Sequence, residues 1–195
     1  TACEAGRDVL IFGDYAIEPV TGPPIFPNRA LREAGLFQAR SVRGRLYHDL
    51  HASAAFAMAD HQTAELLILD PDRRDAAIKT LEQLDGVDAI QDLEGRLIAV
   101  ARPGRWFAYP WWDAAREAPD FAWHVDIHNK PGYDPCELFF GWPPPSICRD
   151  PARLRGTHGR IGEGMDSAWA CSWEPDGACE TLPDLARMTA RKLEP

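Results

Sequence analysis

Several histidines of this chain lie beside carboxylates in the sequence. Six histidines are present, and the close pairs are His48 with Asp49, Asp60 with His61, and Asp126 with His128. Imidazole and carboxylate together form the ligand sets of zinc and manganese sites. Asp126 and His128 are two positions apart, so a strand would place both side chains on one face. The spacing fits a pair of metal ligands, and it equally fits a carboxylate that orients an imidazole.

A second candidate is His158, which lies in the segment Gly156-Thr157-His158-Gly159. Glycine at both ends lets the backbone bend tightly and approach a ligand closely. The flanking arginines are Arg153, Arg155 and Arg160. They concentrate positive charge in an otherwise acidic chain, which suits a phosphate group. The segment indicates either a functional histidine or a structural turn.

Residues 128–135 read as a stiff polar loop that carries His128, Lys130, Tyr133 and Asp134. Its two prolines restrict the backbone, and Pro-Gly is typical of a turn. Such a loop could orient catalytic groups, and it could equally be a structural corner.

Asp14 directly follows residues 8–13, an apolar run that ends in glycine. A run of this kind is typical of a strand buried on both faces in a parallel sheet. Ligands of open α/β sheets bind just beyond the carboxyl ends of such strands. Asp14 is therefore placed for chemistry, or it caps a turn.

The remaining pattern predicts the elements that would position these residues. We expect a helix from Asn28, as its N-cap, to a stop at Gly35, and then a hairpin about Arg43-Gly44. A strand over 64–69, a helix over 72–84 and strands over 87–90 and 96–101 predict a small β-α-β-β unit, interpreted as an inserted cap. A last helix is expected over 182–193. The aromatic residues of 106–123 are expected mostly in the core, with the rest available to line a pocket.

Composition limits the class of protein. The chain has 195 residues, of which 45% are hydrophobic, and a net charge of −9, which fits one domain with a small insert. The acidic balance argues against nucleic acid as a partner. No apolar run reaches the roughly 20 residues of a membrane span. The five cysteines lack C-x-x-C spacing, so we expect free thiols in the cytoplasm, with a single Cys171–Cys179 bridge as the alternative.

Together these segments resemble the alkaline phosphatase superfamily, in particular its type I phosphodiesterase/nucleotide pyrophosphatase family. The segments that match in the family's order are Gly13-Asp14-Tyr15-Ala16, residues 28–36, residues 95–104, residues 126–139 and Gly156-Thr157-His158-Gly159. The last two are the most specific, and residues 126–139 resemble a loop of a bacterial subgroup. The resemblance covers nearly the whole chain.

The resemblance implies an α/β fold: a partial alkaline-phosphatase-like parallel sheet with helices, plus the small β-α-β-β cap. The chain would then divide into a first part of the catalytic core at 1–51, the cap at 52–105, and a return to the core at 106–195. The loops that carry the metal and phosphate ligands would lie in this last part.

The implied site is a two-metal centre for phosphoryl transfer to a Thr or Ser nucleophile. Asp14 would ligate one metal and His158 the other, with Asp126 as a further ligand. Catalytic roles would fall to His128, as a ligand or an orienting group, and to Lys130 and Arg160, which could hold a phosphate. The cofactors would be divalent metal ions, zinc first, with manganese or magnesium as alternatives. The substrate would be a phosphate ester or a nucleotide, with no nucleic acid or membrane as partner and the oligomeric state open.

Two departures from the family pattern matter. Tyr15 stands where the family has a histidine, and a phenol must lose a proton of pKa about 10 before it binds zinc well. The family's nucleophile and one ligand pair lie upstream of the Asp14 strand, yet only 13 residues precede Asp14. We therefore expect this chain to be the C-terminal part of an enzyme, inactive without the remaining N-terminal half. The rival hypothesis is a non-catalytic module in which the aromatic cluster and the cap bind a small molecule or a protein.

Overall fold

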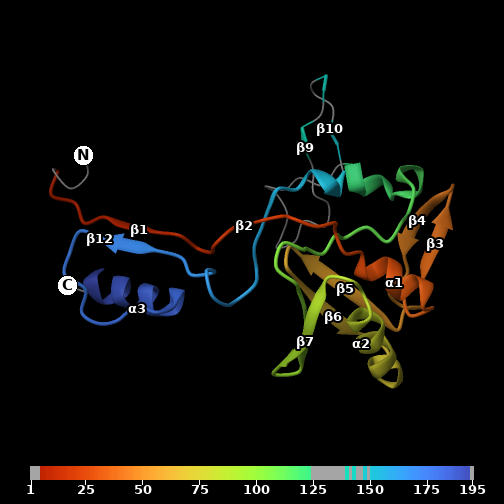
Figure 1. Ribbon diagram of the computed structural model, residues 1–195, viewed down its shortest axis with the longest axis horizontal. Coiled ribbons are helices and arrows are strands. Elements are labelled where there is room, and N and C mark those ends of the chain that lie inside the picture. The colour runs from red at the N-terminus through yellow and green to blue at the C-terminus, as the bar shows by residue number, and fades with distance from the viewer. Residues whose placement is uncertain (1–4, 124–138, 141, 144–146, 149, 194–195) are drawn as a thin grey trace. The chain divides into compact units, whose positions relative to one another are not determined.

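The computed structural model describes residues 5–123, 139–140, 142–143, 147–148 and 150–193 (Figure 1). The chain divides into two compact units. The large unit is Ile17–Arg160, and the small unit joins Thr1–Ala16 to Ile161–Pro195. The fold is mixed α/β, as predicted from the sequence, and no described helix is long and apolar enough to cross a membrane.

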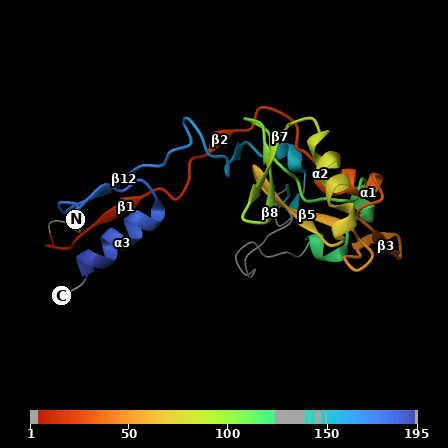
Figure 2. The same cartoon turned by 90° about the horizontal axis from the view of Figure 1, so that it is seen from below.

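A four-stranded antiparallel sheet lies at the centre of the large unit (Figure 2). Its strands are β5 (Ala55–Asp60), β6 (Thr63–Ile68), β7 (Val87–Leu93) and β8 (Arg96–Ala101), in the order β5-β6-β8-β7. The 3₁₀ turn η1 (Pro71–Arg73) and helix α2 (Arg74–Glu82) connect β6 to β7. The predicted helix and its flanking strands are confirmed, but a further strand precedes them, so the unit is β-β-α-β-β.

Strand β5 was not predicted because three of its six residues are alanine, which has low strand propensity. Its consecutive residues Ala55, Phe56 and Ala57 are all buried, since both faces of the strand are covered. Phe56 packs against Phe37 and Tyr109 on one face, with ring centroids 5.6 and 6.1 Å away. Tertiary packing thus determines this strand more than its local sequence does.

Helix α1 (Pro27–Glu33) corrects the prediction for Asn28. The N-cap is Phe26, and Asn28 lies inside the first turn, fully buried. The Asn28 side-chain amide donates to the Ala57 carbonyl (2.7 Å) and its oxygen accepts from the Ala57 N–H (2.8 Å). Because β5 is an edge strand of the sheet, these bonds satisfy backbone groups that no neighbouring strand reaches. Gly35 ends the helix region with φ +70°, as predicted.

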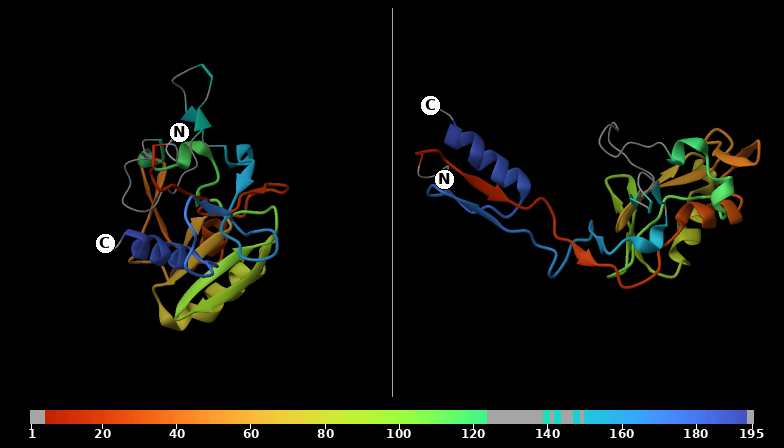
Figure 3. Two further views of the ribbon diagram at one scale, coloured as in Figure 1. Left: turned by 90° about the vertical axis from the view of Figure 1, so that its left-hand side faces the viewer. Right: turned by 90° about the horizontal axis from the view of Figure 1, so that it is seen from above.

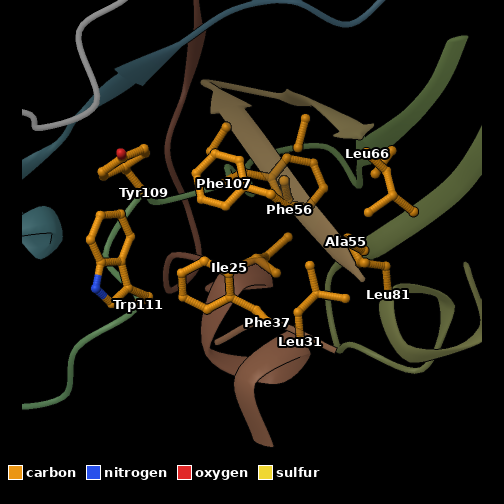
Figure 4. Close-up of a cluster of buried hydrophobic side chains, with 14 of the residues drawn as sticks. Ile25, Leu31, Phe37, Ala55, Phe56, Leu66, Leu81, Phe107, Tyr109 and Trp111 are labelled. Atoms are coloured by element: carbon orange, nitrogen blue, oxygen red, sulfur yellow. The ribbon is translucent and has the colours of Figure 1, made fainter. Parts of the chain in front are cut away.

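The aromatic segment after Pro103 forms the core, as expected (Figure 4). Trp106, Phe107 and Trp111 are essentially fully buried. The Trp111 ring lies 5.1 Å from Tyr109 and 5.7 Å from Phe37, and its Nε1–H donates to the Leu46 carbonyl (3.0 Å). The rings are therefore shielded from water, and the indole N–H of Trp111 keeps a hydrogen-bond partner.

The other elements of the large unit are short. The predicted hairpin is confirmed as β3 (Ala39–Val42) and β4 (Arg45–His48). Strand β2 (Glu18–Pro19) pairs with β11 (Gly156–Thr157), and β9 (Phe139–Phe140) pairs with β10 (Ile147–Cys148). The 3₁₀ turns are η2 (Ala115–Glu117), η3 (Asp120–Trp123) and η4 (Pro151–Arg153).

The small unit consists of β1 (Leu10–Phe12), β12 (Trp169–Cys171) and helix α3 (Leu182–Leu193), which runs alongside the two strands (Figure 3). The helix confirms the prediction for residues 182–193. The prediction that residues 8–13 form a strand buried on both faces is wrong for this structure, because Ile11 and Phe12 are 68% and 52% exposed. Strand β1 pairs with β12 and is antiparallel to it.

The ladders among the described residues are all antiparallel, and an isolated bridge between Ile25 and Phe107 is parallel. The described part therefore lacks the expected parallel sheet. The parts predicted at 1–51, 52–105 and 106–195 stay a prediction. Cys171 and Cys179 are free thiols, so the alternative of a bridge between them is wrong.

Helix α3 begins with a capping arrangement that predicts a pH effect. Asp184 accepts from the Thr181 N–H (3.0 Å) and hydroxyl (2.7 Å), and these bonds with that to Arg187 lower its pKa from 3.8 to about 2. Because the pKa of the Asp184 carboxyl is lower in the folded chain than in the unfolded chain, its ionised form stabilises the fold at a pH above the unfolded-chain value. This stabilisation is lost as the pH falls through the pKa of the folded chain. We expect helix content, followed by circular dichroism, to fall between about pH 4 and pH 2.

The control is the Asp184→Asn variant, whose side chain does not titrate in this range and which should show a flatter profile of helix content against pH. An unchanged profile would contradict this assignment.

Candidate functional site

The candidate site forms around the tight turn between β5 and β6, which contains His61 and Gln62. His61 has φ +53°, a left-handed conformation that is uncommon for residues other than glycine. Its carbonyl accepts from the Phe107 N–H (2.6 Å), and the Gln62 carbonyl accepts from the Ala101 N–H (2.9 Å). The turn is thus held from two sides by backbone bonds.

The Gly156–Arg160 segment packs directly against this turn. Strand β11 pairs with β2, and just beyond it the His158 carbonyl accepts from the Gln62 N–H (2.9 Å). The His158 and His61 rings lie with centroids 4.1 Å apart and their planes tilted by 36°. Both residues are half-buried. His158 is therefore brought into contact with a second imidazole 97 positions earlier in the sequence.

A buried polar network lies next to the two histidines. The Gln62 amide is fully buried and donates to Glu18 Oε1 (2.5 Å), which also accepts from the Gly104 N–H (2.5 Å). The Gln62 side-chain oxygen accepts from the Arg160 N–H (3.4 Å). These bonds connect β2, the β5–β6 turn and the segment that follows β11, so the turn is fixed through side chains as well as backbone.

The Arg160 guanidinium is engaged inside the large unit. It lies 3.2 Å from Asp88 and donates to the Ala101 carbonyl, and the side chain is only 17% exposed. The role of Arg160 in holding a phosphate stays a prediction. The guanidinium would have to bind the phosphate while it keeps, or after it gives up, its bonds to Asp88 and the Ala101 carbonyl.

His48, another histidine with an acidic neighbour, is an exposed residue of β4 whose ring lies at the edge of the aromatic cluster. Its ring lies 5.4 Å from Trp111 and 6.4 Å from Phe121. Partial burial lowers the pKa of His48, against the opposite effect of the adjacent Asp49 carboxylate. The neutral imidazole is therefore favoured, and the contacts of the ring with Trp111 and Phe121 are with aromatic side chains.

Asp14 lies in the small unit, in the wall of a cavity of about 530 Å³. The cavity is lined by the aromatic side chains Phe12, Tyr15 and Trp169 and by the carboxylates Asp14, Asp166 and Glu180, among other residues. No lysine or arginine is among its lining residues. Asp14 accepts a hydrogen bond from the Tyr15 N–H (3.0 Å). This surrounding favours positively charged ligands over anions.

The fit to a metal can be tested on the donor sets of the described residues. In that part of the chain no group of three or more His, Cys, Asp or Glu side chains is placed to hold an ion. His158 supplies an imidazole, a donor type that zinc prefers, and the His61 ring lies against it, so the chemistry fits part of a usual four-ligand set. The other metal ligands would have to come from residues outside the described part of the chain or from a second chain.

The remaining predicted site residues are placed as follows. Asp126, His128 and Lys130 lie outside the described residues, so their roles stay predictions. Asp14 belongs to the small unit and His158 to the large unit, and the two-metal centre in which each would ligate one ion also stays a prediction. Sequence reasoning missed Glu18 and Gln62, since nothing local marks residues 44 positions apart as hydrogen-bonded partners.

Comparison of the chain with protein-family models, curated proteins and solved structures gives no match.

Proposed function

We propose that this chain is the C-terminal part of a metal-dependent phosphodiesterase or nucleotide pyrophosphatase, which hydrolyses phosphate esters or anhydrides. The observation that carries the proposal is the contact of His158 with His61 on the rigid β5–β6 turn. A half-buried imidazole that packs against a fixed turn is suited to ligation, because these contacts leave less freedom to be lost on binding. The proposal also draws on the resemblance of the Gly156–Gly159 segment to the family's metal-binding motif.

In this proposal His158 holds a divalent ion, with Asp14 and Asp126 as ligands of the complete centre. The ion, zinc first, would polarise the phosphoryl oxygens. His128 would ligate or orient, and Lys130 and Arg160 would hold the phosphate of the substrate. Gln62 and Glu18 fix the backbone of the turn from within, and so keep the position of His158 constant.

The proposal includes a partner, the half of the enzyme that carries the nucleophile. Ile11 and Phe12 belong to a run with the composition of a central strand, yet they are 68% and 52% exposed. A two-stranded sheet is also marginal by itself in water. A parallel core sheet, completed by strands of that half, would cover these side chains.

Replacing His158 by alanine tests the proposal. The wild-type chain should bind Co²⁺ or Zn²⁺, and His158→Ala should weaken this binding at least about 100-fold, because loss of a direct ligand costs more than loss of a supporting group. Calorimetry and cobalt absorbance measure the affinity. His51→Ala is the matched control, since His51 is exposed in a turn. In the intact gene product the His158 variant should also lose hydrolysis of a bis-aryl phosphate while remaining folded.

A non-catalytic binding module is the second candidate, and the cavity around Asp14 favours it. Its aromatic and acidic lining could hold a small positively charged molecule without any metal. The version in which the aromatic cluster of 106–123 binds a ligand has less support, because Trp106, Phe107 and Trp111 are buried. An intact product that binds no metal and hydrolyses no ester would favour the module over the enzyme.

A further inference from the structure

His61 has an uncommon backbone conformation. It adopts φ +53° between Asp60 and Gln62, a region that glycine enters freely and that histidine and asparagine enter more often than most other residues. Such a conformation persists where the surrounding structure holds it, and it is found often at functional sites. Here the Phe107 N–H and the bonds of Gln62 hold the turn. The side chain of His61 is therefore displayed from a fixed point.

What His61 contacts is the ring of His158. The ring centroids are 4.1 Å apart and the ring planes are tilted by 36°, so the rings are in close contact and nearer to parallel than to perpendicular. The segment of His158 also approaches the turn closely. Gly159 has φ +114°, and a side chain there would begin 3.6 Å from the Gln62 nitrogen and 3.5 Å from the Thr63 methyl. The backbone on the C-terminal side of His158 is thus in van der Waals contact with the turn.

Two charged side chains near this segment, Arg160 and Glu18, are bonded to groups other than the two histidine rings. Arg160 extends to Asp88 and the Ala101 carbonyl, and Glu18 is taken by Gln62 and Gly104. The ring of His61 lies against the ring of His158, with centroids 4.1 Å apart.

We propose that His61 is a positioning residue for His158: its ring is the platform that fixes the orientation of the His158 imidazole. The role needs a flat ring rather than a second ligand nitrogen. A ligand whose orientation is set before binding loses less freedom when the ion arrives, which is how supporting groups raise metal affinity. The metal measurement below rests on the proposed function, whereas the reactivity measurement does not.

Three substitutions separate the ring from the nitrogen. His61→Asn removes the ring and keeps a residue that tolerates the left-handed backbone. His61→Gly suits that backbone still better and serves as a second ring-free variant. His61→Phe keeps a flat ring and removes both nitrogens. His51→Asn is the matched control on an exposed turn. Circular dichroism and thermal unfolding establish that each full-length chain is folded.

Two readouts follow on the 195-residue chain. The first is the rate at which diethyl pyrocarbonate modifies His158, read by peptide mass spectrometry. We expect the ring-free variants to be modified several-fold faster than the wild type, and His61→Phe to keep close to the wild-type rate. The second is Co²⁺ affinity, which should fall about 10-fold to 100-fold in the ring-free variants and remain near the wild-type value with phenylalanine.

The outcomes are distinguishable. Ring-free variants whose His158 is modified at the wild-type rate overturn the proposal, whatever their cobalt affinity. A phenylalanine variant that behaves like the asparagine variant in the modification assay also overturns it, because then the ring is not what matters. A wild-type chain that binds no Co²⁺ counts against the proposed function alone, and the modification rates still decide the role of His61.

Discussion

Truncation of Trp111 to alanine should destabilise the large unit by about 3–5 kcal/mol, the usual range for a buried tryptophan. Its ring is fully buried and lies 5.1 Å from both Tyr109 and Trp112. The change removes these contacts, leaves a cavity, and leaves the Leu46 carbonyl without the indole donor that now lies 3.0 Å away. A domain of this size has only about 5–15 kcal/mol of stability in all. Urea unfolding followed by fluorescence or circular dichroism measures the loss.

Two companion variants make the Trp111 prediction specific. Trp142→Ala should change the free energy of unfolding by less than about 0.5 kcal/mol, since Trp142 is 88% exposed. Trp111→Phe should fall between wild type and alanine, because it keeps most of the apolar contact but loses the hydrogen bond to Leu46. Equal unfolding midpoints for Trp111→Ala and Trp142→Ala would show that this aromatic cluster does not stabilise the unit.

The sequence was most informative where a local pattern determines the element. Helix α2 carries buried Ala77 and Leu81 one helical turn apart, and α3 carries Leu185 and Met188 in the same way. The hairpin β3–β4 was predicted from two short strand patterns about Arg43-Gly44, and in the structure both of these turn residues have positive φ.

Prediction failed where distant residues decide. Strand β5 is a strand because Phe37, Tyr109 and Trp111 cover the Phe56 face, and its alanines give no such signal. Asn28 matches the preference for an N-cap residue, yet burial against Ala57 satisfies its amide better than a cap would. In both cases a tertiary contact outweighs the local preference.

The candidate site shows the same division. Glycines on both sides marked His158 as a presented residue, and the Asp60–His61 pair was visible as a possible ligand pair. Their contact depends on how the β5–β6 turn meets the segment after β11, which no spacing in the sequence encodes. Residue types thus indicated the chemistry, and only the fold could join the two imidazoles.

The second large effect is expected for Asn28→Leu, which should cost about 2–4 kcal/mol of unfolding free energy. The side chain is fully buried and bonds both the N–H and the carbonyl of Ala57, which is itself fully buried. Leucine leaves these two backbone groups without their partners, and a buried unsatisfied group costs about 1–3 kcal/mol. Glu33→Leu is the matched control, because Glu33 is exposed on the same helix and should tolerate the change. Urea unfolding of the two variants measures the difference.

A third substitution at position 28 tests the direction of each bond. Asn28→Asp keeps an acceptor for the Ala57 N–H but places a second oxygen against the Ala57 carbonyl, where the amide now donates at 2.7 Å. A protonated carboxyl can donate to that carbonyl, whereas an ionised one cannot. The free energy of unfolding of the aspartate variant should therefore rise relative to that of wild type as the pH falls below about 5. Carboxylates that hydrogen bonds stabilise in their charged form, such as Asp184, have the opposite effect, because their contribution to stability is lost at low pH. If Asn28→Leu unfolds at the same urea concentration as Glu33→Leu, the two bonds to Ala57 contribute nothing, and the edge of β5 must be satisfied in another way.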